Sequence, residues 1–493
     1  MKKNQQKSFG RVLILALLLL LVACRPEPIV VHITATPVLS ELPPATNATL
    51  TTPEMTIVTP TPPAPDATLY GPVIGTGYVL PTLPSATPPP TPTTTPGPTG
   101  TPVSSPGTPT LSPAPSATNT TAPTNTPDPT RHPVLPNLDA NRMGIQIDQE
   151  RPVEEWVYAL DRATALGVTW IKIQVPWLAY QPNGPDQREG GALDSLDDFL
   201  LEAQRRNFSV LISVAKAPAW ARPTVEENGP PNDPQQLADF LTFLFTRRGG
   251  QTVDAVEVWN EPNLQREWRG MPLTGASYMS YFAAAYTAIR DYSSTLPIIT
   301  AGLAPTGNGD ASRNDRDYLQ EMYAAGLGNY QNIYIGAHPY SWGNPPEARC
   351  CDLSDAGGWD DQPQFFFSDN IDAIRTIMNQ NGDANVLIWV TEFGWATWDG
   401  FSTPLPAGET WMTEVDRWAQ AHYIIRAFAI GQQRSDIGIM ILWNMNYATQ
   451  LNVERSDERA AYAIVTATIR PAYWMIKDAI NPNLSYNDYE NGE

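Results

Sequence analysis

The chain has 493 residues, of which 50 are prolines, and its formal net charge is -20 at pH 7. A chain this acidic lacks the excess of Lys and Arg that neutralises phosphates, which excludes nucleic-acid binding as an interpretation. The proline content is far above that of an average globular domain, which indicates that an extended part accompanies a folded part.

The N-terminus has the pattern of an export signal. Basic residues precede an apolar run over residues 12–22, which is shorter than the roughly 20 residues of a membrane-spanning helix. The run ends in Leu-Val-Ala-Cys at residues 21–24, which resembles the bacterial lipobox. We therefore predict a signal peptide over residues 1–23 and a diacylglyceryl group on Cys24, which implies an extracytoplasmic lipoprotein anchored to a membrane. An ordinary signal peptide that contains a cysteine is the alternative.

Residues 24–136 are dominated by Pro, Thr, Ser and Ala. Such a segment lacks the apolar side chains that offset the entropy lost on ordering. We predict a disordered, polyproline-like linker there, whose composition also permits O-glycosylation. The folded domain is then predicted to occupy residues 137–493.

From about residue 141, short β-rich runs alternate with helical stretches. The expected strands are residues 143–148, 170–175, 209–215, 255–259, 298–303, 333–337, 386–391 and 438–443, and the expected helices include 153–166, 193–206, 234–247, 275–292 and 415–432. Eight strand–helix units predict a parallel sheet closed into a (β/α)8, or TIM, barrel. A doubly wound open sheet is the alternative, but it usually has fewer strands and a Gly-rich turn after the first strand, which this chain lacks.

Two glutamates follow predicted strands at the end of the barrel where active sites are found. Glu261 lies in Trp-Asn-Glu-Pro-Asn after the fourth strand, and Glu392 lies in Thr-Glu-Phe-Gly-Trp after the seventh. Burial at the rim of the core is expected to raise the pKa of Glu261, as a general acid requires, while a second, ionised carboxylate attacks an anomeric carbon. Standard barrel dimensions place the two carboxyl groups roughly 6 Å apart, nearer to the retaining than to the inverting spacing.

These motifs, at these strands, resemble the clan A glycoside hydrolases, which include the family 5 cellulases and the family 39 xylosidases. The resemblance covers the region from about residue 143 to about residue 480. It implies a retaining hydrolase of a β-linked glycan that works by double displacement, with Glu261 as acid/base and Glu392 as nucleophile. It further implies that Asn260 binds the sugar 2-hydroxyl, Tyr340 contacts the nucleophile, His338 lies near the acid/base, and Trp443 forms the floor under the reacting sugar.

Other residues are less firmly placed by the resemblance. Family 5 members usually carry an Arg in the second strand, and Lys172 is the candidate replacement here, which leaves the exact family open. Tryptophans at loop positions are candidates for a sugar-binding groove, with loop or core packing as the alternative for each. They are Trp177, Trp220, Trp342, Trp395 and Trp398, of which we expect Trp177 and Trp395 to bind substrate.

The remaining expectations concern cofactors, partners and cysteines. The chain has 4 His, and only His338 follows a predicted strand, so we expect no metal centre and no cofactor. We expect a monomer whose partner is a polysaccharide or oligosaccharide; a non-catalytic carbohydrate-binding lipoprotein and a transglycosylase are the alternative functions. Cys350 and Cys351 are neighbours, and two free thiols are favoured over a strained vicinal disulfide because adjacent Cα atoms are only about 3.8 Å apart across a trans peptide.

Overall fold

The structure is a computed structural model that describes residues 134–482, apart from residues 187, 223, 225–227, 352–361 and 406–407. The predicted signal peptide, the predicted lipid site at Cys24 and nearly all of the predicted linker lie outside the described residues. Within the described part, none of the helices combines the length and the apolar character that a bilayer crossing demands.

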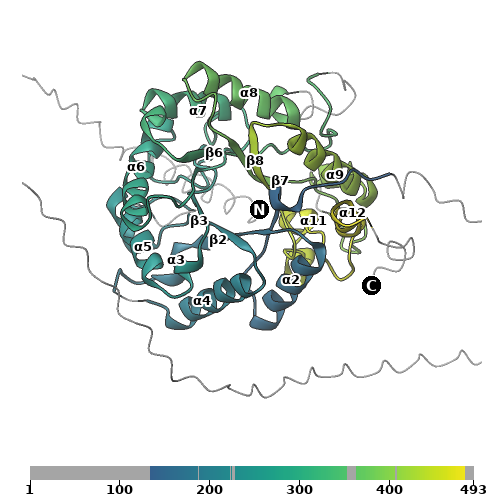
Figure 1. The fold of residues 1–493 in the computed structure, drawn as a ribbon, viewed down its shortest axis with the longest axis horizontal. Helices are drawn as coiled ribbons and strands as arrows, with labels where there is room; N and C mark the ends of the chain where they lie inside the picture. The colour runs from purple at the N-terminus through teal and green to yellow at the C-terminus, as the bar shows by residue number, and fades with distance from the viewer. Residues whose placement is uncertain are drawn as a thin grey trace, which may run out of the picture. The chain divides into compact units, whose positions relative to one another are not determined.

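Eight parallel strands form a closed barrel in which each strand pairs with the next and β8 pairs with β1 (Figure 1). The strands are β1 (Met143–Gln146), β2 (Trp170–Pro176), β3 (Ser209–Ala215), β4 (Ala255–Val258), β5 (Ile298–Thr300), β6 (Ile333–Ala337), β7 (Ile388–Phe393) and β8 (Ile437–Leu442). Their residues are almost all buried, as strands must be when helices cover the outside of a barrel and side chains fill its inside. The predicted (β/α)8 fold is confirmed.

Helices surround the strands (Figure 1). They are α2 (Val153–Leu166), α3 (Trp177–Tyr180), α4 (Gly190–Arg205), α5 (Pro234–Thr246), α6 (Gly275–Tyr292), α7 (Asp315–Ala324), α8 (Phe367–Gln380), α9 (Arg417–Gln433), α10 (Gln450–Glu454), α11 (Glu458–Tyr462) and α12 (Pro471–Ile480). Local sequence explains where several begin: Asp233 caps α5 by accepting a hydrogen bond from the Gln235 amide, Pro234 occupies the first turn, and Asp416 caps α9 in the same way.

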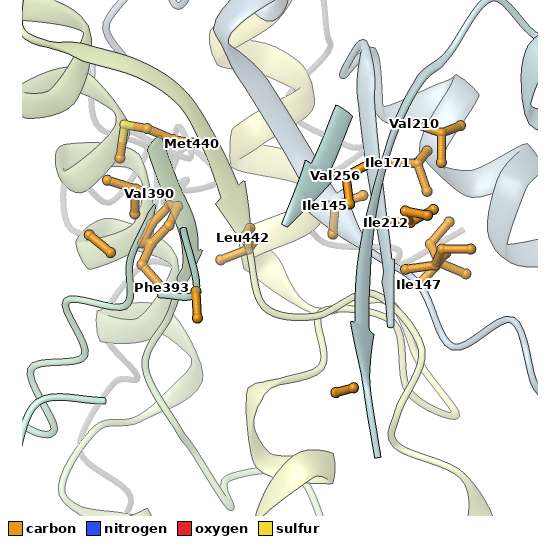
Figure 2. Packing of buried hydrophobic residues seen from close by; sticks show 14 of the residues in the cluster. Ile145, Ile147, Ile171, Val210, Ile212, Val256, Val390, Phe393, Met440 and Leu442 are labelled. Carbon is orange, nitrogen blue, oxygen red and sulfur yellow. The ribbon is translucent and has the colours of Figure 1, made fainter. Parts of the chain in front are cut away.

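The main core lies between the barrel and its helices. Figure 2 shows part of this cluster, including Ile145, Ile171, Ile212 and Val256 from the first four strands and Leu442 from β8. A second, smaller apolar cluster includes alternate residues of the strands, namely Leu211, Ala255, Ile299, Trp389 and Ile441. Because side chains alternate between the two faces of a strand, this cluster belongs to the inside of the barrel.

Several of the predicted strand limits and one cysteine expectation differ from the structure. β1 ends at Gln146 and β5 at Thr300, each earlier than predicted, and β7 (Ile388–Phe393) begins and ends two residues later than predicted. Cys350 and Cys351 are joined by a disulfide in the structure, so the vicinal pairing, and not a pair of free thiols, is what the fold contains.

Candidate active site

Glu261 and Glu392 face each other at the mouth of the barrel. Glu261 comes three residues after the end of β4, Glu392 is the next-to-last residue of β7, and both are at least nine-tenths buried. One oxygen of each, together with a ring nitrogen of His338, forms a set of atoms that all lie within 4.8 Å of one another. Glu261 has a φ of 43° and Trp259 a φ of 77°, a left-handed conformation that is rare for residues with a side chain and gathers at functional sites.

His338 lies between these two carboxylates. Its Nδ1 is 3.1 Å from Glu261 Oε1 and 3.8 Å from Glu392 Oε2, and its ring is fully buried. Burial alone lowers the pKa of an imidazole, but the charge of Glu392, the Glu257 carboxylate 3.6 Å from Nε2 and the hydrogen bond to Glu261 outweigh it and raise the pKa of His338 to about 9. His338 is therefore a cation at neutral pH, held among three acids.

The pKa of Glu261 departs from the sequence-based expectation. Burial does act to raise it, as expected, but the hydrogen bond and charge of His338 act in the opposite direction, and Arg266 and Lys172 add to them. The pKa of Glu261 is therefore lowered, and the expected raised value is wrong for the free protein. The reason is a cation 3.1 Å away, which a linear sequence does not reveal.

The carboxylate of Glu392 accepts hydrogen bonds on both oxygens. Lys172 Nζ donates to Oε1 over 2.9 Å, and the Tyr340 hydroxyl donates to Oε2 over 2.9 Å. The side-chain amide of Gln146 also donates a hydrogen bond from its nitrogen to Glu392 Oε1 over 3.1 Å. In this orientation the amide oxygen accepts a hydrogen bond from Trp443 Nε1 over 3.3 Å. Three donors from three strands or strand ends therefore fix the orientation of the carboxylate.

Glu261, His338 and Glu392 are also close enough to share a metal ion as ligands. The ammonium group of Lys172 already lies 2.9 Å from Glu392, and the charged imidazole of His338 lies 3.1 Å from Glu261. Each carboxylate is thus compensated by a cation of the protein itself, which is the requirement for burying it.

A cleft of about 1320 Å³ opens above these residues. It exceeds the usual size of a pocket for one small molecule, roughly 300–1,000 Å³. Asn260, Tyr340 and Trp443 line it, as do Glu261 and Glu392. The Asn260 Oδ1 atom is buried and lacks a hydrogen-bond partner among the described residues, so it remains able to bind a donor of a ligand.

The tryptophans divide into two groups. Trp443 and Trp342 line the cleft. Trp177 and Trp395 do not line it, and each is about 1% exposed. The expectation that they contact substrate is therefore wrong. Trp177 stacks on Phe240 of α5 at a ring distance of 5.0 Å, and Trp395 packs on Phe367 of α8. Both side chains turn towards the helical layer, because consecutive residues at a strand end point to opposite faces.

Trp220 and Trp398 also lie outside the cleft. Trp220 is half-buried with its ring edge against Trp177, and Trp398 is buried against Phe401. For Trp177, Trp220, Trp395 and Trp398 the packing alternative is therefore the correct one, and Trp342 is the loop tryptophan of that set that reaches the cleft.

Several residues of the site were missed from the sequence. Gln146 is the last residue of β1, whereas the predicted strand ran on to residue 148, which hid its place at the strand end. Glu257 was missed as well, although, like Lys172, it is a charge inside an otherwise apolar strand, which is a readable signal of a buried ion pair. Trp411 and Arg266 also line the cleft, but Trp411 lies in a short 3-10 helix between β7 and α9 and Arg266 in the loop after β4, and no local pattern distinguishes them from other connecting residues.

Comparison with known proteins agrees with this geometry. The family model described as cellulase, glycosyl hydrolase family 5, matches residues 137–448, which is more than half of the chain. No curated protein matches the chain.

Among solved structures, a family 39 glycoside hydrolase from Bacteroides cellulosilyticus WH2 is 17% identical with a TM-score of 0.52, and the match covers 70% of this chain and 65% of that one, slightly less than two thirds. A monomeric β-xylosidase from Caulobacter crescentus CB15 is 14% identical, with a TM-score of 0.48 and coverage of 70% and 68%. An endo-β-1,4-glucanase from Xanthomonas axonopodis pv. citri is 14% identical, with a TM-score of 0.43 and coverage of 69% and 99%. At 17% identity, the likeness to the family 39 enzyme concerns the fold.

Proposed function

Because the chain belongs to glycosyl hydrolase family 5, the cellulase family, we propose that it is a glycosidase. We propose further that it hydrolyses a β-linked glycan with retention of configuration. Glu392 is the nucleophile and Glu261 the acid/base in this proposal. The observation that carries it is the approach of one oxygen of each carboxylate to within 4.8 Å. Retaining enzymes hold their two carboxyl groups about 5–5.5 Å apart, whereas inverting enzymes hold them about 6.5–9.5 Å apart to admit a water molecule.

In the first step, Glu392 attacks the anomeric carbon. The bond from its carboxylate oxygen to that carbon forms while the bond from the carbon to the leaving oxygen breaks. Lys172 and Tyr340 orient the carboxylate through their 2.9 Å contacts, which keep its attacking geometry fixed before the sugar arrives. The product of this step is a glycosyl ester on Glu392.

The leaving oxygen needs a proton, and the pair of Glu261 and His338 supplies it. The pair holds at least one proton throughout the neutral range because the pKa of His338 is raised to about 9. With Nδ1 and Oε1 3.1 Å apart, that proton passes to Glu261 along the hydrogen bond and from there to the leaving oxygen. In the second step, the ionised Glu261 takes a proton from water, which attacks the ester and releases the sugar.

Two further side chains suit the reacting sugar. The orphaned Asn260 Oδ1 is available for the 2-hydroxyl group, a contact that strengthens in the transition state of such reactions. Trp443 lines the cleft and is held by its ring NH against Gln146, so its indole face is fixed as a floor under the pyranose.

The test is the stereochemistry of the product and the site of the covalent intermediate. The protein is screened against xylan, glucan and mannan fragments, and the anomer first formed is followed by proton NMR. We expect the β-anomer, and we expect an activated 2-fluoro glycoside to label Glu392 in peptide mass spectra. An α-anomer would refute retention, and binding of a glycan without any turnover would favour a carbohydrate-binding protein. Product analysis at high acceptor concentration distinguishes a transglycosylase.

We also propose that the protein is exported and anchored through Cys24. The support is the sequence alone, in which an apolar run ends in Leu-Val-Ala-Cys. A Cys24→Ser variant expressed in a bacterium that processes lipoproteins is expected to leave the membrane fraction and to lose incorporation of labelled fatty acid. Unchanged fractionation and no label in the wild type would contradict the anchor.

A further inference from the structure

Glu257 is a third acidic residue beneath the two catalytic candidates. It lies in the middle of β4 (Ala255–Val258), is fully buried, and follows Ala255 of the apolar cluster inside the barrel by two residues. An ionised carboxylate in such a place costs several kcal/mol unless it is paired and hydrogen-bonded. The ion pairs and hydrogen bonds that stabilise the Glu257 carboxylate therefore indicate its role.

Its partners come from three other strands or strand ends. Lys172 Nζ of β2 lies 2.8 Å from Glu257 Oε2. The Thr391 hydroxyl of β7 donates to Oε1 over 2.5 Å, and the Gly302 amide, just after β5, donates to Oε1 over 3.1 Å. This set fixes the carboxylate from several sides and leaves it little freedom to rotate.

The same two cations that contact Glu257 also contact the catalytic candidates. Lys172 Nζ reaches Glu392 Oε1 over 2.9 Å. On the other side, His338 Nε2 lies 3.6 Å from Glu257 Oε1, while its Nδ1 lies 3.1 Å from Glu261 Oε1. Acids and cations therefore alternate in one buried series, in the order Glu392, Lys172, Glu257, His338 and Glu261.

We propose that Glu257 is a positioning residue, which anchors Lys172 and His338 and through them orients the nucleophile and the acid/base. The roles of Glu261 and Glu392 in this statement rest on the proposed function. Glu257 itself lies beneath the reacting groups and does not line the cleft, so it acts through the two cations. Removing its charge leaves both cations short of an anion and frees the Lys172 ammonium to move.

The charged and titratable groups that face Glu257 come from every element packed against it. Lys172 of β2, His338 after β6 and Tyr278 of α6 act on Glu257 directly, while Glu392 of β7 contacts Lys172 and Glu261 after β4 contacts His338. Burial raises the pKa of Glu257, but Lys172 and His338 outweigh burial and hold that pKa well below its usual range. Glu257 is thus an anion throughout the working range, and it helps His338 to retain its proton.

The direct test is the titration of His338, which requires no turnover. The full-length protein is labelled with 13C in its histidines, and the His338 signal is identified by its loss in His338→Asn. In the wild type we expect the His338 signal to titrate with a midpoint at about pH 9. In Glu257→Gln we expect that midpoint to fall by about one pH unit or more, because one of the three facing anions is gone.

The matched control is Asp197→Asn. Asp197 is a buried carboxylate on α4 that pairs with Arg247 over 2.7 Å, outside the residues that line the cleft. It is expected to leave the His338 midpoint in place. A midpoint in Glu257→Gln that also equals the wild-type value would overturn the proposal. Should Glu257→Gln not fold, Glu257→Asp keeps the charge, shortens its reach and is expected to lower the same midpoint by a smaller amount.

Kinetics give an independent reading once a substrate is known. We expect Glu257→Gln to lower kcat by about tenfold or more with KM changed by less than about threefold, because positioning is lost and the cleft is intact. Lys172→Arg should retain more activity than Lys172→Met, since it keeps the cation between two carboxylates. Equal activity of Glu257→Gln and the wild type would refute the positioning role. If the wild type shows no turnover at all, the proposed function fails, while the His338 titration still tests the coupling.

Discussion

Gly302 and the imidazole of His338 are packed so closely that no side chain fits between them. A Cβ atom on Gly302 would meet His338 Cδ2 at 2.2 Å and Nε2 at 2.3 Å. The ring is enclosed on its other sides by Glu257, Glu261 and Glu392, so it cannot retreat without breaking these contacts. The glycine after β5 therefore sets the position of the histidine after β6.

We expect Gly302→Ala to displace His338 and to damage activity more than folding. Overpacking a buried site typically costs about 1–3 kcal/mol of stability, so the variant should remain folded. Its kcat/KM should fall by about tenfold or more, since the hydrogen bond from His338 to Glu261 loses its geometry. Thermal unfolding and steady-state kinetics together check this. Wild-type activity in a folded Gly302→Ala protein would contradict the packing argument.

A second prediction concerns stability at alkaline pH. The pKa of His338 is raised to about 9 in the folded protein, from an ordinary value near 6.5. A raised pKa stabilises the fold fully below the unfolded value, and the contribution is lost as pH rises through the folded value. The free energy of unfolding should thus decline between about pH 6.5 and pH 9, by roughly 3 kcal/mol at most from this residue.

The comparison protein for that measurement is His338→Asn, which has no proton to lose. Denaturant unfolding between pH 6 and pH 9.5 should give a flatter dependence for the variant than for the wild type. Parallel curves would mean that His338 does not carry its proton in the folded state. At low pH the buried carboxylates that face His338 also take up protons, and this changes the free energy of unfolding in the opposite direction. The contribution of His338 is therefore best measured in the alkaline range.

The sequence predicts those site residues whose place follows from a strand end, and it does not predict those that only tertiary packing brings to the site. The eight strands follow from short β-rich runs, and Glu261 and Glu392 follow because a residue at a strand end must lie at the barrel mouth. Trp177 and Trp395 were assigned wrongly since the face of a strand-end side chain changes with a shift of one residue. Trp411 reaches the cleft from a short 3-10 helix in the connection between β7 and α9, and only tertiary packing brings it there.

The charged residues of the site are likewise predicted only in part from the sequence. The sequence indicates that Lys172 and Glu257 form a pair, because charges in apolar strands need partners. It does not indicate that this pair also contacts the catalytic candidates. The direction of the pKa of Glu261 was not predictable. It depends on a balance between burial and a cation 3.1 Å away, and such a distance exists only in the folded chain.

A third prediction assigns Trp342 to the leaving group. Trp342 follows β6, on the arc of the barrel between Glu261 and Glu392, whereas Trp443 follows β8 outside that arc. Its ring stands at 83° to that of Trp411, with centroids 4.6 Å apart, and both rings line the cleft. A sugar chain that rests on Trp443 and crosses Glu261 would therefore reach Trp342 next.

We expect Trp342→Ala to lower kcat/KM for oligosaccharides by about 5–30-fold, the effect of about 1–2 kcal/mol of lost ring contact. Cleavage of an aryl glycoside with a small leaving group should change much less. Trp220→Ala is the control, because Trp220 is half-buried outside the cleft. Equal losses on both kinds of substrate would show that Trp342 supports the fold of the site and does not bind the leaving sugar.

A fourth prediction concerns the Pro- and Thr-rich segment. The barrel closes on itself through the pairing of β1 with β8, so its hydrogen bonding needs no strand from outside the described residues. A protein that begins at residue 134 is therefore expected to keep the melting temperature and the kcat of the full chain. Loss of all activity on this truncation would show that the segment takes part in the site.

The last prediction uses Arg266, which approaches Glu261, the proposed acid/base, from the solvent side. Its Nη2 lies 3.5 Å from Glu261 Oε2, and its side chain is 61% exposed. Burial, His338 and then Arg266 act on the pKa of Glu261, with the two cations lowering it. Arg266→Gln removes one cation, so the pKa of Glu261 rises and the acid keeps its proton to higher pH.

The alkaline limb of the pH dependence of kcat/KM should therefore move upward in Arg266→Gln. Because the guanidinium is largely in water, the shift should be only a few tenths of a pH unit at low salt, and it should vanish near 1 M salt, where charges are screened beyond about 3 Å. Arg248→Gln is a control, since Arg248 is equally exposed but pairs with Asp198 on α4. A downward shift, or an upward one that persists in high salt, would mean that Arg266 acts on the site by packing and not by its charge.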